Sequence, residues 1–334
     1  MSWENEPYAD FIEKHTRGKN IKLFNQEERG SLDVNSLNTI ISLSHSNKQR
    51  WLNKHLESIN KMLSDGGVFI GNAEVLDQKK KAIKSNYPPL LNRLIYFWLF
   101  ALHRVIPKLP VLKTVYFSLT KGRHRVVSRM EMFGRLYSCG FRISSWQDID
   151  NVLWFAAIKD KPPAYNEKAT YGMFIRLKRR GFKNEFFLVY KFRTMYAYSE
   201  YLQAFIFENY GLDSGGKFKN DPRVNTIGRF LRKYWIDELP MIINILRGEI
   251  KLVGVRPLSS HYFSLYPKEL QVLRGKVKPG LLPPYYADLP EGFKEVCDSE
   301  EKYIKAYLEA PWKTDFNYLV RILYNILVKW VRSN

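Results

Sequence analysis

The sequence predicts an α+β protein made of two parts with different secondary-structure patterns. In residues 21–160, amphipathic helix patterns alternate with short apolar strand patterns, which is typical of an α/β domain with a partial Rossmann-like sheet. In residues 161–334, a single β-hairpin pattern is followed by a series of helices, which predicts a mainly helical domain. An apolar, proline-broken hairpin at residues 90–119 interrupts the first part, and the polar residues 1–20 are expected to form a flexible N-terminus.

The chain carries a large excess of positive charge. Its 334 residues include 53 lysines and arginines against 33 aspartates and glutamates, which gives a formal net charge of +20. Such an excess indicates an anionic partner, whether nucleic acid, anionic lipid headgroups or a phosphorylated substrate. Cys139 and Cys297 are far apart and the histidines show no paired spacing. We therefore expect a reducing cytoplasm, no disulfide framework and no zinc site. Residues 1–10 are acidic and polar, so no signal peptide is predicted there.

Two helix–strand units support the α/β prediction. Asn47–Leu63 predicts an amphipathic helix, and a Gly66–Gly67 turn and a short buried strand at Val68–Ile70 follow it. Ser128–Ile143 predicts a second helix, glycine and strand, and Val152–Lys159 a further strand. These units weakly resemble the C-terminal half of a class I methyltransferase sheet, but no glycine-rich cofactor loop precedes them. We therefore predict neither methyl transfer nor bound S-adenosylmethionine, and expect a structural or regulatory domain.

The stretch Leu90–Leu119 combines apolar residues with two prolines. Its cleanest apolar run, Leu94–Leu102, is far shorter than the ~20 residues that a membrane-spanning helix needs. Because Pro107 and Pro110 break the helix, the two arms are expected to dip into one leaflet of a membrane and return. The alternative is a buried helical hairpin that packs on the first domain.

A basic cluster follows this hairpin. Beside an anionic leaflet, each of its cations would contribute ~1 kcal/mol to membrane binding. The alternative is a solvated, charged loop. The cluster consists of Lys121, Arg123, His124, Arg125 and Arg129.

The second part opens with a predicted β-hairpin, Met173–Leu177 and Glu185–Phe192, with Lys178–Asn184 as its turn. Tyr196–Asn209 is expected to be helical, and its aromatic side chains suit either a core or an interfacial belt. Val277–Pro290 is predicted to be a rigid, proline-rich loop. Further helices are predicted at Ser259–Tyr266, Glu269–Leu273 and Ser299–Leu308.

The last predicted helix, Asp315–Val331, has a wide apolar face and a narrow polar stripe. Such a helix suits a membrane interface, where the apolar face is buried among lipids. A helix of the protein core is the alternative. The stripe consists of Asn317, Arg321, Asn325 and Lys329, which recur every four residues.

Two adjacent carboxylates, Asp237 and Glu238, stand at the start of a further predicted helix. We expect Asp237 at the N-cap, Pro240 in the first turn and Gly248 at the C-terminal end. The plain alternative is that Asp237 only caps this helix and Glu238 only interacts with its dipole. The expected apolar face consists of Met241, Ile242, Ile245 and Leu246.

Cations flank the carboxylate pair in the sequence. Because cations can hold the phosphates of a substrate while one acid attacks phosphorus or binds a metal, the pattern suits phosphate chemistry. The free N–H groups at the helix start are also expected to keep Asp237 ionised. The flanking cations are Arg223, Arg229, Arg232 and Lys233 before the pair, and Arg247, Lys251 and Arg256 after it.

Five motifs occur in order around the pair. They are KFRTM (Lys191–Met195), KNDPR (Lys219–Arg223), GRFLRKYWIDELP (Gly228–Pro240), NILRGEIKLVGVRPL (Asn244–Leu258) and VKPGL (Val277–Leu281). Their order closely resembles the bacterial sugar transferase family, the monotopic polyprenyl-phosphate phosphoglycosyl transferases. The resemblance covers roughly Tyr165–Asn334, half of the chain.

The sequence departs from this family in two places. The apolar hairpin is more charged, and Thr120–Lys161 is inserted before the catalytic region. The Gly-Leu-Trp-Gln-like segment of many relatives is missing from Val277–Pro290, so the acceptor or sugar preference is expected to differ.

The resemblance implies that Asp237 is the nucleophile of an Asp-Glu dyad. It would attack the sugar-bearing phosphate of a nucleotide diphosphate sugar, release the nucleoside monophosphate and hold the phosphosugar covalently. A polyprenyl phosphate would then take the phosphosugar. Glu238 would share an Mg²⁺ ion with Asp237 and position the acceptor.

The resemblance also implies a set of substrate contacts. Arg232 and Arg256, with the neighbouring Pro257, would contact phosphate or nucleotide, which suits the planar fork of arginine. Glu301 lies near a further acid of the relatives and ranks low. Weaker candidates for substrate contacts are Lys191, Arg193 and Arg223.

Together these features imply a monotopic enzyme on the cytoplasmic face of the bacterial inner membrane. It would transfer a phosphosugar from a nucleotide sugar, expected to be a UDP-sugar, to undecaprenyl phosphate and so initiate exopolysaccharide or lipopolysaccharide assembly. An anionic membrane surface is the further expected partner, a homodimer is left open, and no nucleic acid is expected.

Two alternatives remain at this level. A basic, aromatic-rich nucleic-acid-binding protein would fit the charge, but the sequence has no helix-turn-helix, zinc or RNP-like signature. A catalytically silent membrane scaffold on the same fold would have no need of the intact Asp237–Glu238 pair.

Overall fold

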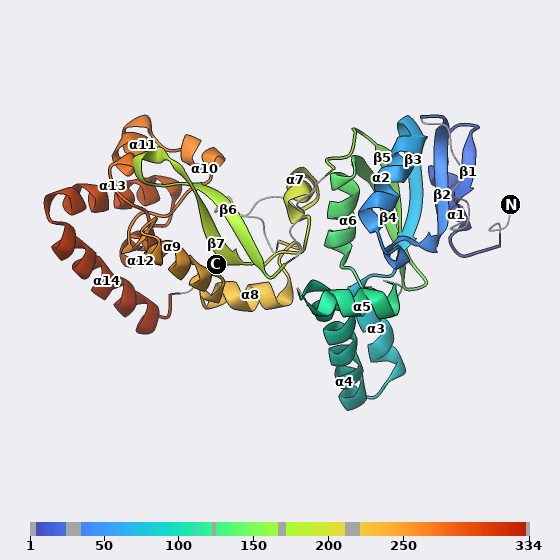
Figure 1. Cartoon of the computed structure of the whole chain (residues 1–334), viewed down its shortest axis with the longest axis horizontal. Helices are drawn as coiled ribbons and strands as arrows, with labels where there is room; N and C mark the ends of the chain where they lie inside the picture. Colours follow the sequence, from blue (N-terminus) through green and yellow to red (C-terminus); the bar gives the residue numbers. More distant parts are fainter. Residues whose placement is uncertain are drawn as a thin grey trace. The chain divides into compact units, whose positions relative to one another are not determined.

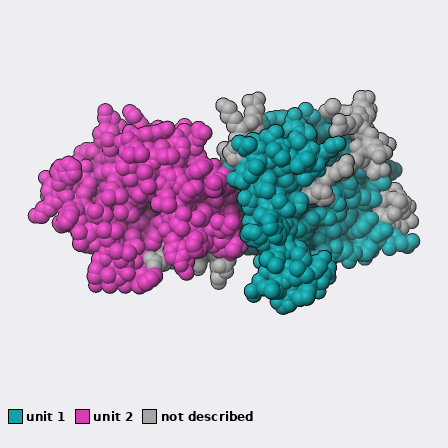
Figure 2. Space-filling view, turned by 60° about the horizontal axis from the view of Figure 1, so that its bottom comes forward, with its two compact units in different colours: residues 1–172, 196–212, 218–223 teal, residues 173–195, 213–217, 224–334 magenta. Residues whose placement is uncertain are grey.

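The computed structural model describes residues 5–24, 35–109, 111–121, 125–165, 172–210 and 221–331. The chain forms two compact units (Figure 2). Unit 1 comprises residues 1–172, 196–212 and 218–223, and unit 2 comprises residues 173–195, 213–217 and 224–334. The boundary expected at residue 160 therefore differs from the structure, because two short segments beyond residue 195 belong to unit 1.

A five-stranded sheet forms the centre of unit 1 (Figure 1). Its strand order is β1-β2-β3-β5-β4. Strands β1 (Ile21–Phe24), β2 (Leu37–His45) and β3 (Leu63–Ala73) are parallel. Strand β5 (Val152–Lys159) runs antiparallel between β3 and β4 (Phe141–Ile149). The mixed α/β character is confirmed, and the reversed β5 makes the sheet mixed rather than wholly parallel.

Helices cover both faces of this sheet. Ile40 and Ile41 are neighbours on β2 and therefore point to opposite faces. Ile40 packs in one cluster with the helices α2 (Leu52–Met62) and α6 (Arg129–Ser138). Ile41 packs in another cluster with α1 (Ala9–His15). Two buried layers therefore enclose the sheet.

The N-terminal helix α1 corrects one expectation. Residues 1–20 were predicted to be flexible because they are polar, yet α1 occupies residues 9–15. Phe11 is 5% exposed and Ile12 1% exposed, and both pack against strand residues of the sheet. Three apolar residues in one short helix therefore suffice to bind this segment to the sheet.

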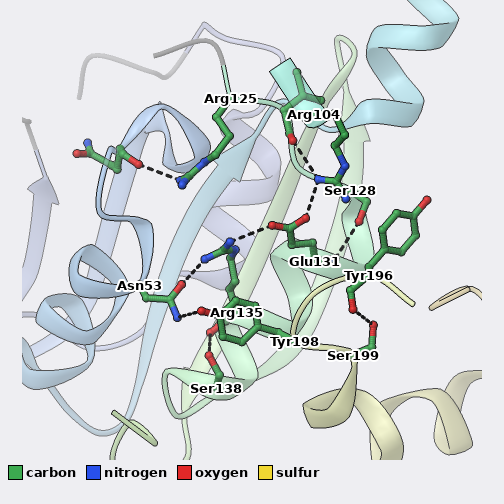
Figure 3. A network of polar contacts seen from close by, with 12 residues as sticks. Asn53, Arg104, Arg125, Ser128, Glu131, Arg135, Ser138, Tyr196, Tyr198 and Ser199 are labelled. Carbon is green, nitrogen blue, oxygen red and sulfur yellow. Dashed lines mark hydrogen bonds and ion pairs between the residues drawn. The ribbon is translucent and has the colours of Figure 1, made fainter. Parts of the chain in front are cut away.

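A buried polar network links the apolar hairpin to helix α6 (Figure 3). Glu131 of α6 accepts from Arg104 Nη1 at 2.6 Å and from Arg135 Nη2 at 2.9 Å. Arg104 also donates to the carbonyl of Val126. Because Arg104, Glu131 and Arg135 are each about 5% exposed or less, the network is fully inside the unit.

The same helix binds a segment that comes from beyond residue 195. A 3₁₀ turn (Ser199–Leu202) and helix α7 (Gln203–Tyr210) follow β7 in the sequence but pack in the core of unit 1. Phe205 lies between Phe133 and Trp146, with ring centroids 5.5 Å from each. Tyr198 accepts a hydrogen bond from Asn53 (Figure 3). The aromatic residues of this predicted helix are therefore mostly core residues, except for the exposed Phe207.

The predicted hairpin at residues 90–119 consists of short helical pieces. These are α4 (Pro89–Phe100), a π-helical turn (Ala101–Val105), a 3₁₀ turn (Ile106–Lys108) and α5 (Leu112–Thr120). Helix α4 follows α3 (Leu76–Asn86) and buries none of its residues. Its exposed residues include Leu90 at 76% and Phe97 at 61%. The alternative of a hairpin buried on the first domain is therefore wrong for α4.

No helix within the described residues is both long and apolar enough to cross a membrane. The basic cluster after the hairpin lies partly outside the described residues, at positions 123 and 124. Of the rest, Arg129 forms an ion pair with Asp148 at 2.6 Å, and Arg125 donates to the carbonyl of Gln49. These two cations therefore have structural roles in unit 1.

Unit 2 is built on the predicted hairpin, β6 (Phe174–Arg180) and β7 (Phe186–Phe192). Strand β6 is longer than predicted and includes residues that the sequence assigned to the turn. After the hairpin, short helices alternate with two short parallel strands, β8 and β9. These elements are α8 (Thr226–Lys233), a 3₁₀ helix (Ile236–Met241), α9 (Ile242–Leu246), β8 (Lys251–Val253), α10 (Ser260–Ser264), α11 (Lys268–Gly275), β9 (Gly280–Leu282), α12 (Tyr285–Asp288), α13 (Phe293–Glu309) and α14 (Pro311–Leu327).

The proline-rich stretch 277–290 is more regular than predicted. It contains β9, which pairs with β8, and the short helix α12. The pairing requires a close approach of two backbones at Gly254 and Gly280. A Cβ atom on Gly280 would lie 2.1 Å from the backbone nitrogen of Gly254, so only glycine fits there.

Two residues of the polar stripe of α14 contact the protein, and much of its apolar surface is exposed. Arg321 forms an ion pair with Asp288 at 2.6 Å, and Asn325 donates to the carbonyls of Tyr286 and Ala287 at 2.9 and 3.0 Å. These contacts hold α12 against α14. On the exposed face, Trp312 is 91% accessible. Other exposed residues of this face are Phe316, Val320, Leu323, Tyr324 and Leu327.

Candidate active site

The centre of the candidate site is an ion pair between a strand and the Asp-Glu segment. Lys191 near the end of β7 donates to Oε1 of Glu238, which lies in the 3₁₀ helix Ile236–Met241. The Lys191 side chain is 16% exposed and the Glu238 side chain 18%. Lys191, predicted only as a weaker candidate, is therefore in direct contact with the dyad.

The local backbone differs from the predicted N-cap arrangement. Trp235, not Asp237, occupies the N-cap position of the 3₁₀ helix, with φ of +55° in the left-handed region. Its indole N–H donates to the hydroxyl of Tyr286 at 2.7 Å. A left-handed conformation costs a non-glycine residue roughly 1–3 kcal/mol, which the surrounding contacts must offset. Asp237 is thus free of a capping role, and the alternative of a simple cap is wrong.

The apolar face predicted after the dyad is also largely solvent-exposed. Met241 is buried and Ile245 packs partly against it. Ile242 is 48% exposed and Leu246 83% exposed. Gly248 ends this stretch with φ of +67°, as predicted.

Burial dominates the electrostatics of the dyad. Asp237 is 9% exposed, and this burial raises the pKa of its carboxyl above the ordinary value. The charge of Glu238 raises the pKa further, while Lys191 and Arg232 oppose the rise. Desolvation therefore acts against the ionised form of Asp237, and the cations limit this effect.

The same burial acts on the lysine. Desolvation lowers the pKa of Lys191, Glu238 raises it, and the nearby Arg256 lowers it. Glu238 therefore favours the charged form of Lys191. The pair compensates one positive with one negative charge, so Lys191 is not a free cation for a substrate phosphate.

Arg256 lies in the turn after β8 and is held there by a buried ion pair that the sequence reasoning missed. Arg274 of α11 pairs with Glu300 of α13, and both side chains are at most 4% exposed. Arg274 also donates to the carbonyl of Arg256. Glu300 is the neighbour of Glu301, which forms only an exposed ion pair with Lys305. The acid with a structural role here is Glu300: it pairs with Arg274, which in turn holds the backbone of the Arg256 turn.

The other predicted contacts do not all lie beside the dyad, although the charge of Arg232 acts on Asp237. Arg232 of α8 donates through Nε to the hydroxyl of Thr194 at 2.9 Å, and the backbone N–H of Arg193 donates to the carbonyl of Met173. Arg223 belongs to unit 1, where it binds Asp221 and Gln203.

Two further cations that flank the dyad in the sequence have other partners. Arg247 donates to the hydroxyl of Tyr190, and Lys251 pairs with Asp315 at 2.8 Å. The remaining two, Arg229 and Lys233, are exposed on α8. Fewer cations therefore surround the dyad in the structure than flank it in the sequence.

A pocket opens beside the Lys191–Glu238 pair. Two of its residues, Arg179 on β6 and Tyr285 on α12, were not predicted as site residues. In the hairpin register Arg179 lies opposite Phe187, and Ile175 opposite Lys191, so Arg179 and Lys191 share one face of the hairpin. The lining consists of Arg179, Val189, Lys191, Glu238, Met241, Arg256, Pro257, Gly280, Leu281, Pro283 and Tyr285.

Part of the chain matches a known protein family. Residues 164–328 match the family described as "Bacterial sugar transferase". This part of the chain is a bacterial sugar transferase domain. The N-terminal sheet of unit 1 lies outside the matched residues and is an additional region.

Several curated proteins are similar to the sugar transferase domain. An undecaprenyl-phosphate galactose phosphotransferase of Salmonella typhimurium is 34% identical over 39% of this chain and 26% of its own length. An undecaprenyl-phosphate glucose phosphotransferase of Komagataeibacter xylinus is 46% identical over 24% of this chain and 13% of its own length. An uncharacterized sugar transferase of Bacillus subtilis, EpsL, is 37% identical over 33% of this chain and 48% of its own length. The similarity thus spans at most about half the length of these relatives.

The sugar transferase domain offers a limited set of metal ligands. Within the described residues, no three His, Cys, Asp or Glu side chains gather in a way that could hold a metal ion by themselves. Asp237 and Glu238 are adjacent, and Mg²⁺ commonly uses one or two carboxylates together with substrate phosphates and water. The pair therefore fits an Mg²⁺ ion that takes its other ligands from a bound diphosphate.

Proposed function

We propose that the sugar transferase domain transfers a phosphosugar from a nucleotide diphosphate sugar, with UDP-sugars as the first candidates, to undecaprenyl phosphate. The observation that supports this most directly is the position of Asp237. It stands next to Glu238, whose ion pair with Lys191 forms one wall of a pocket that Arg256 also lines. A carboxylate nucleophile beside phosphate-binding cations is what a covalent phosphoryl-group transfer requires.

The first half-reaction would proceed at Asp237. A carboxylate oxygen of Asp237 attacks the phosphorus that bears the sugar and forms an acyl phosphate bond. The bond from this phosphorus to the bridging oxygen breaks, and the nucleoside monophosphate leaves with the electron pair. In the second half-reaction an oxygen of the lipid phosphate attacks the same phosphorus, and Asp237 leaves as a carboxylate. No proton transfer is needed to balance either step if the phosphates are ionised.

The raised pKa of Asp237 has a role in this scheme. A carboxylate with a higher pKa is a better nucleophile, and its desolvated charge is relieved when the phosphorus–oxygen bond forms. When bound by Asp237 and Glu238, Mg²⁺ would supply positive charge that neutralises the diphosphate. Lys191 holds Glu238 in place for that task.

We further propose that the protein works on the cytoplasmic face of the bacterial inner membrane. The acceptor is a lipid, and two apolar faces are exposed: that of α4 in unit 1 and that of α14 in unit 2. Each is suited to lie among lipid acyl chains without crossing the bilayer. The product would be the first lipid-linked intermediate of an exopolysaccharide or a lipopolysaccharide.

A single-turnover experiment tests the reaction. The full chain in lipid nanodiscs is mixed with Mg²⁺ and a panel of radiolabelled UDP-sugars, without undecaprenyl phosphate. We expect one UDP-sugar to release about one nucleoside monophosphate per enzyme, as a two-step covalent route requires. Release only after lipid addition would contradict the covalent route. No release and no product with any nucleotide sugar would favour a silent scaffold.

A further inference from the structure

The pocket beside the dyad contains two arginines without a carboxylate partner. Arg179 and Arg256 both line it, and within the described residues neither guanidinium forms an ion pair. The Nη1 atom of Arg179 donates to the main-chain carbonyl of its neighbour Lys178, and this carbonyl is an uncharged acceptor. The cations nearby are already engaged, since Lys191 pairs with Glu238 and Arg232 donates to Thr194.

The two guanidinium groups also affect one another. Burial lowers the pKa of Arg179, and the positive charge of Arg256 lowers it further. Glu238 lies close enough to Arg256 for their charges to attract, but it already pairs with Lys191. Three cations and one carboxylate therefore line the pocket, and an anion that accepts from both arginines relieves their mutual repulsion. Planar guanidinium groups bind phosphate through pairs of parallel hydrogen bonds, which makes a phosphate group the best-fitting anion.

The scheme of two displacements limits which phosphate this is. In an in-line displacement the nucleophile and the leaving group lie on opposite sides of the phosphorus. The nucleoside monophosphate therefore leaves from the side opposite to Asp237. In the second step Asp237 is the leaving group, so the lipid phosphate must attack from that same opposite side. The departing nucleotide and the arriving lipid thus place the same chemical group, a phosphate monoester, at one position.

We propose that Arg179 and Arg256 form this shared phosphate-monoester site, which holds the monophosphate of the leaving nucleotide and then that of the polyprenyl phosphate. This inference rests on the proposed two-step function and adds Arg179 as a binding residue for both halves of the reaction. One consequence is that the lipid phosphate cannot bind until the nucleoside monophosphate has left. A second consequence is that the nucleoside monophosphate is a competitive inhibitor with respect to the lipid.

The hairpin provides a matched control for the charge of Arg179. Arg176 lies on the same strand, β6, three residues away and therefore on the opposite face. It is exposed and is not part of the pocket. Arg176→Gln removes the same charge from the same strand, so it reproduces any effect of net charge or strand propensity without touching the site.

Binding of two simple monoesters tests the site independently of turnover. The full chain in detergent is titrated by calorimetry with uridine monophosphate, with decyl phosphate, and with each in the presence of the other. We expect the two to compete. Arg179→Gln should weaken both by a similar factor, roughly tenfold to hundredfold, as expected for lost hydrogen bonds to a charged group. Arg176→Gln should change neither, and Arg179→Lys should recover part of the binding.

The outcomes separate this inference from the proposed function. Independent binding of the two monoesters, or an Arg179→Gln variant that weakens only one of them, would overturn the shared site. Normal binding of both by a folded Arg179→Gln variant would overturn the role of Arg179. Competition and loss in Arg179→Gln, together with no turnover of any nucleotide sugar by the parent protein, would uphold the site and refute only the proposed reaction.

Discussion

Lys191 donates a hydrogen bond to Glu238, the residue directly after Asp237. This contact joins the end of strand β7 to the 3₁₀ helix Ile236–Met241 and holds the side chain of Glu238 in place. Asp237 is the more buried of the two residues, and this burial raises the pKa of its carboxyl group. One acid is thus paired with a cation, and burial raises the pKa of its neighbour, the proposed nucleophile.

Replacement of Asp237 by Asn is expected to abolish turnover. The amide is nearly the same size but cannot form a bond to phosphorus, so activity should fall below detection while the fold persists. The parent protein, quenched with acid after mixing with its donor, should show the added mass of a phosphosugar on a peptide that contains residue 237. Turnover by Asp237→Asn at the parental rate, or product formation without this adduct, would contradict the mechanism.

The same substitution should stabilise the protein at neutral pH. Burial raises the pKa of Asp237 in the folded state above its unfolded value, so ionisation costs the folded state free energy as pH rises through that pKa. Asn carries no charge at any pH. Thermal melts should therefore show a higher Tm for Asp237→Asn than for the parent at pH 7. This pH-dependent gain should disappear as the pH falls well below the unfolded pKa of about 3.9, where the parental carboxyl is neutral in both states. An equal or lower Tm at pH 7 would refute the assignment of a desolvated carboxylate.

Arg256→Lys should lower kcat/KM for the nucleotide sugar by roughly tenfold or more. A lysine keeps the charge but lacks the planar fork, so one of two parallel hydrogen bonds to phosphate is lost. Steady-state kinetics with purified enzyme would measure the change. If both the kinetics and the binding of the nucleotide sugar were unchanged, Arg256 would not be a phosphate-binding residue of the pocket.

Asn325→Ala should destabilise unit 2 and weaken substrate binding. Asn325 is 4% exposed and donates to two carbonyls of the α12 segment, which would be left unsatisfied. A loss of ~1–3 kcal/mol in unfolding free energy follows. KM should also rise, because Tyr285 of α12 lines the pocket. The control is Asn317→Ala, at an exposed position of the same stripe, which should change neither denaturant midpoint nor KM.

Arg104→Met should destabilise unit 1 strongly. It leaves Glu131, which is 3% exposed, with only part of its compensating charge. Removal of one member of a buried ion network typically costs ~3–5 kcal/mol. The midpoint of the unfolding transition of unit 1 should fall accordingly. Arg93→Met, an exposed change on helix α4, provides the comparison and should leave that midpoint unchanged.

Local patterns predicted most elements of the fold. The apolar period of residues 47–63 predicted the helix α2, although the helix begins at Leu52 and a separate 3₁₀ turn at Ser46–Lys48 precedes it. Alternation and apolar runs gave β5 and β7 with bounds within one residue of the structure. Gly248 marked its helix end correctly. These features depend on residues close in sequence, which is why a single sequence reveals them.

The errors at the site have a common physical origin in tertiary contacts. Lys178, Arg179 and Arg180 look like a turn because they are charged, yet β6 continues through them. On one face Arg179 lines the pocket, and on the other the cations of Lys178 and Arg180 lie over the ring of Phe186. Tryptophan has no preference for a left-handed backbone, so the sequence does not indicate that Trp235 rather than Asp237 is the N-cap.

Periodicity also fails to reveal what covers an apolar face. The exposed Leu246 and the buried Met241 are equally apolar in the sequence. Likewise the polar stripe of α14 suggested one edge of a helix in a membrane interface, and it does not reveal that Arg321 and Asn325 bind α12.

The crossing of segment 196–212 into unit 1 has a consequence for how this protein could have arisen. A gene fusion that simply appended the N-terminal sheet to a finished transferase would have left each part with its own interior. Here Leu202, Phe205 and Ile206, from within the matched family residues, complete the interior of the other unit. A chain cut at residue 164 would therefore leave the core of unit 1 without these three side chains and would expose them on the other fragment.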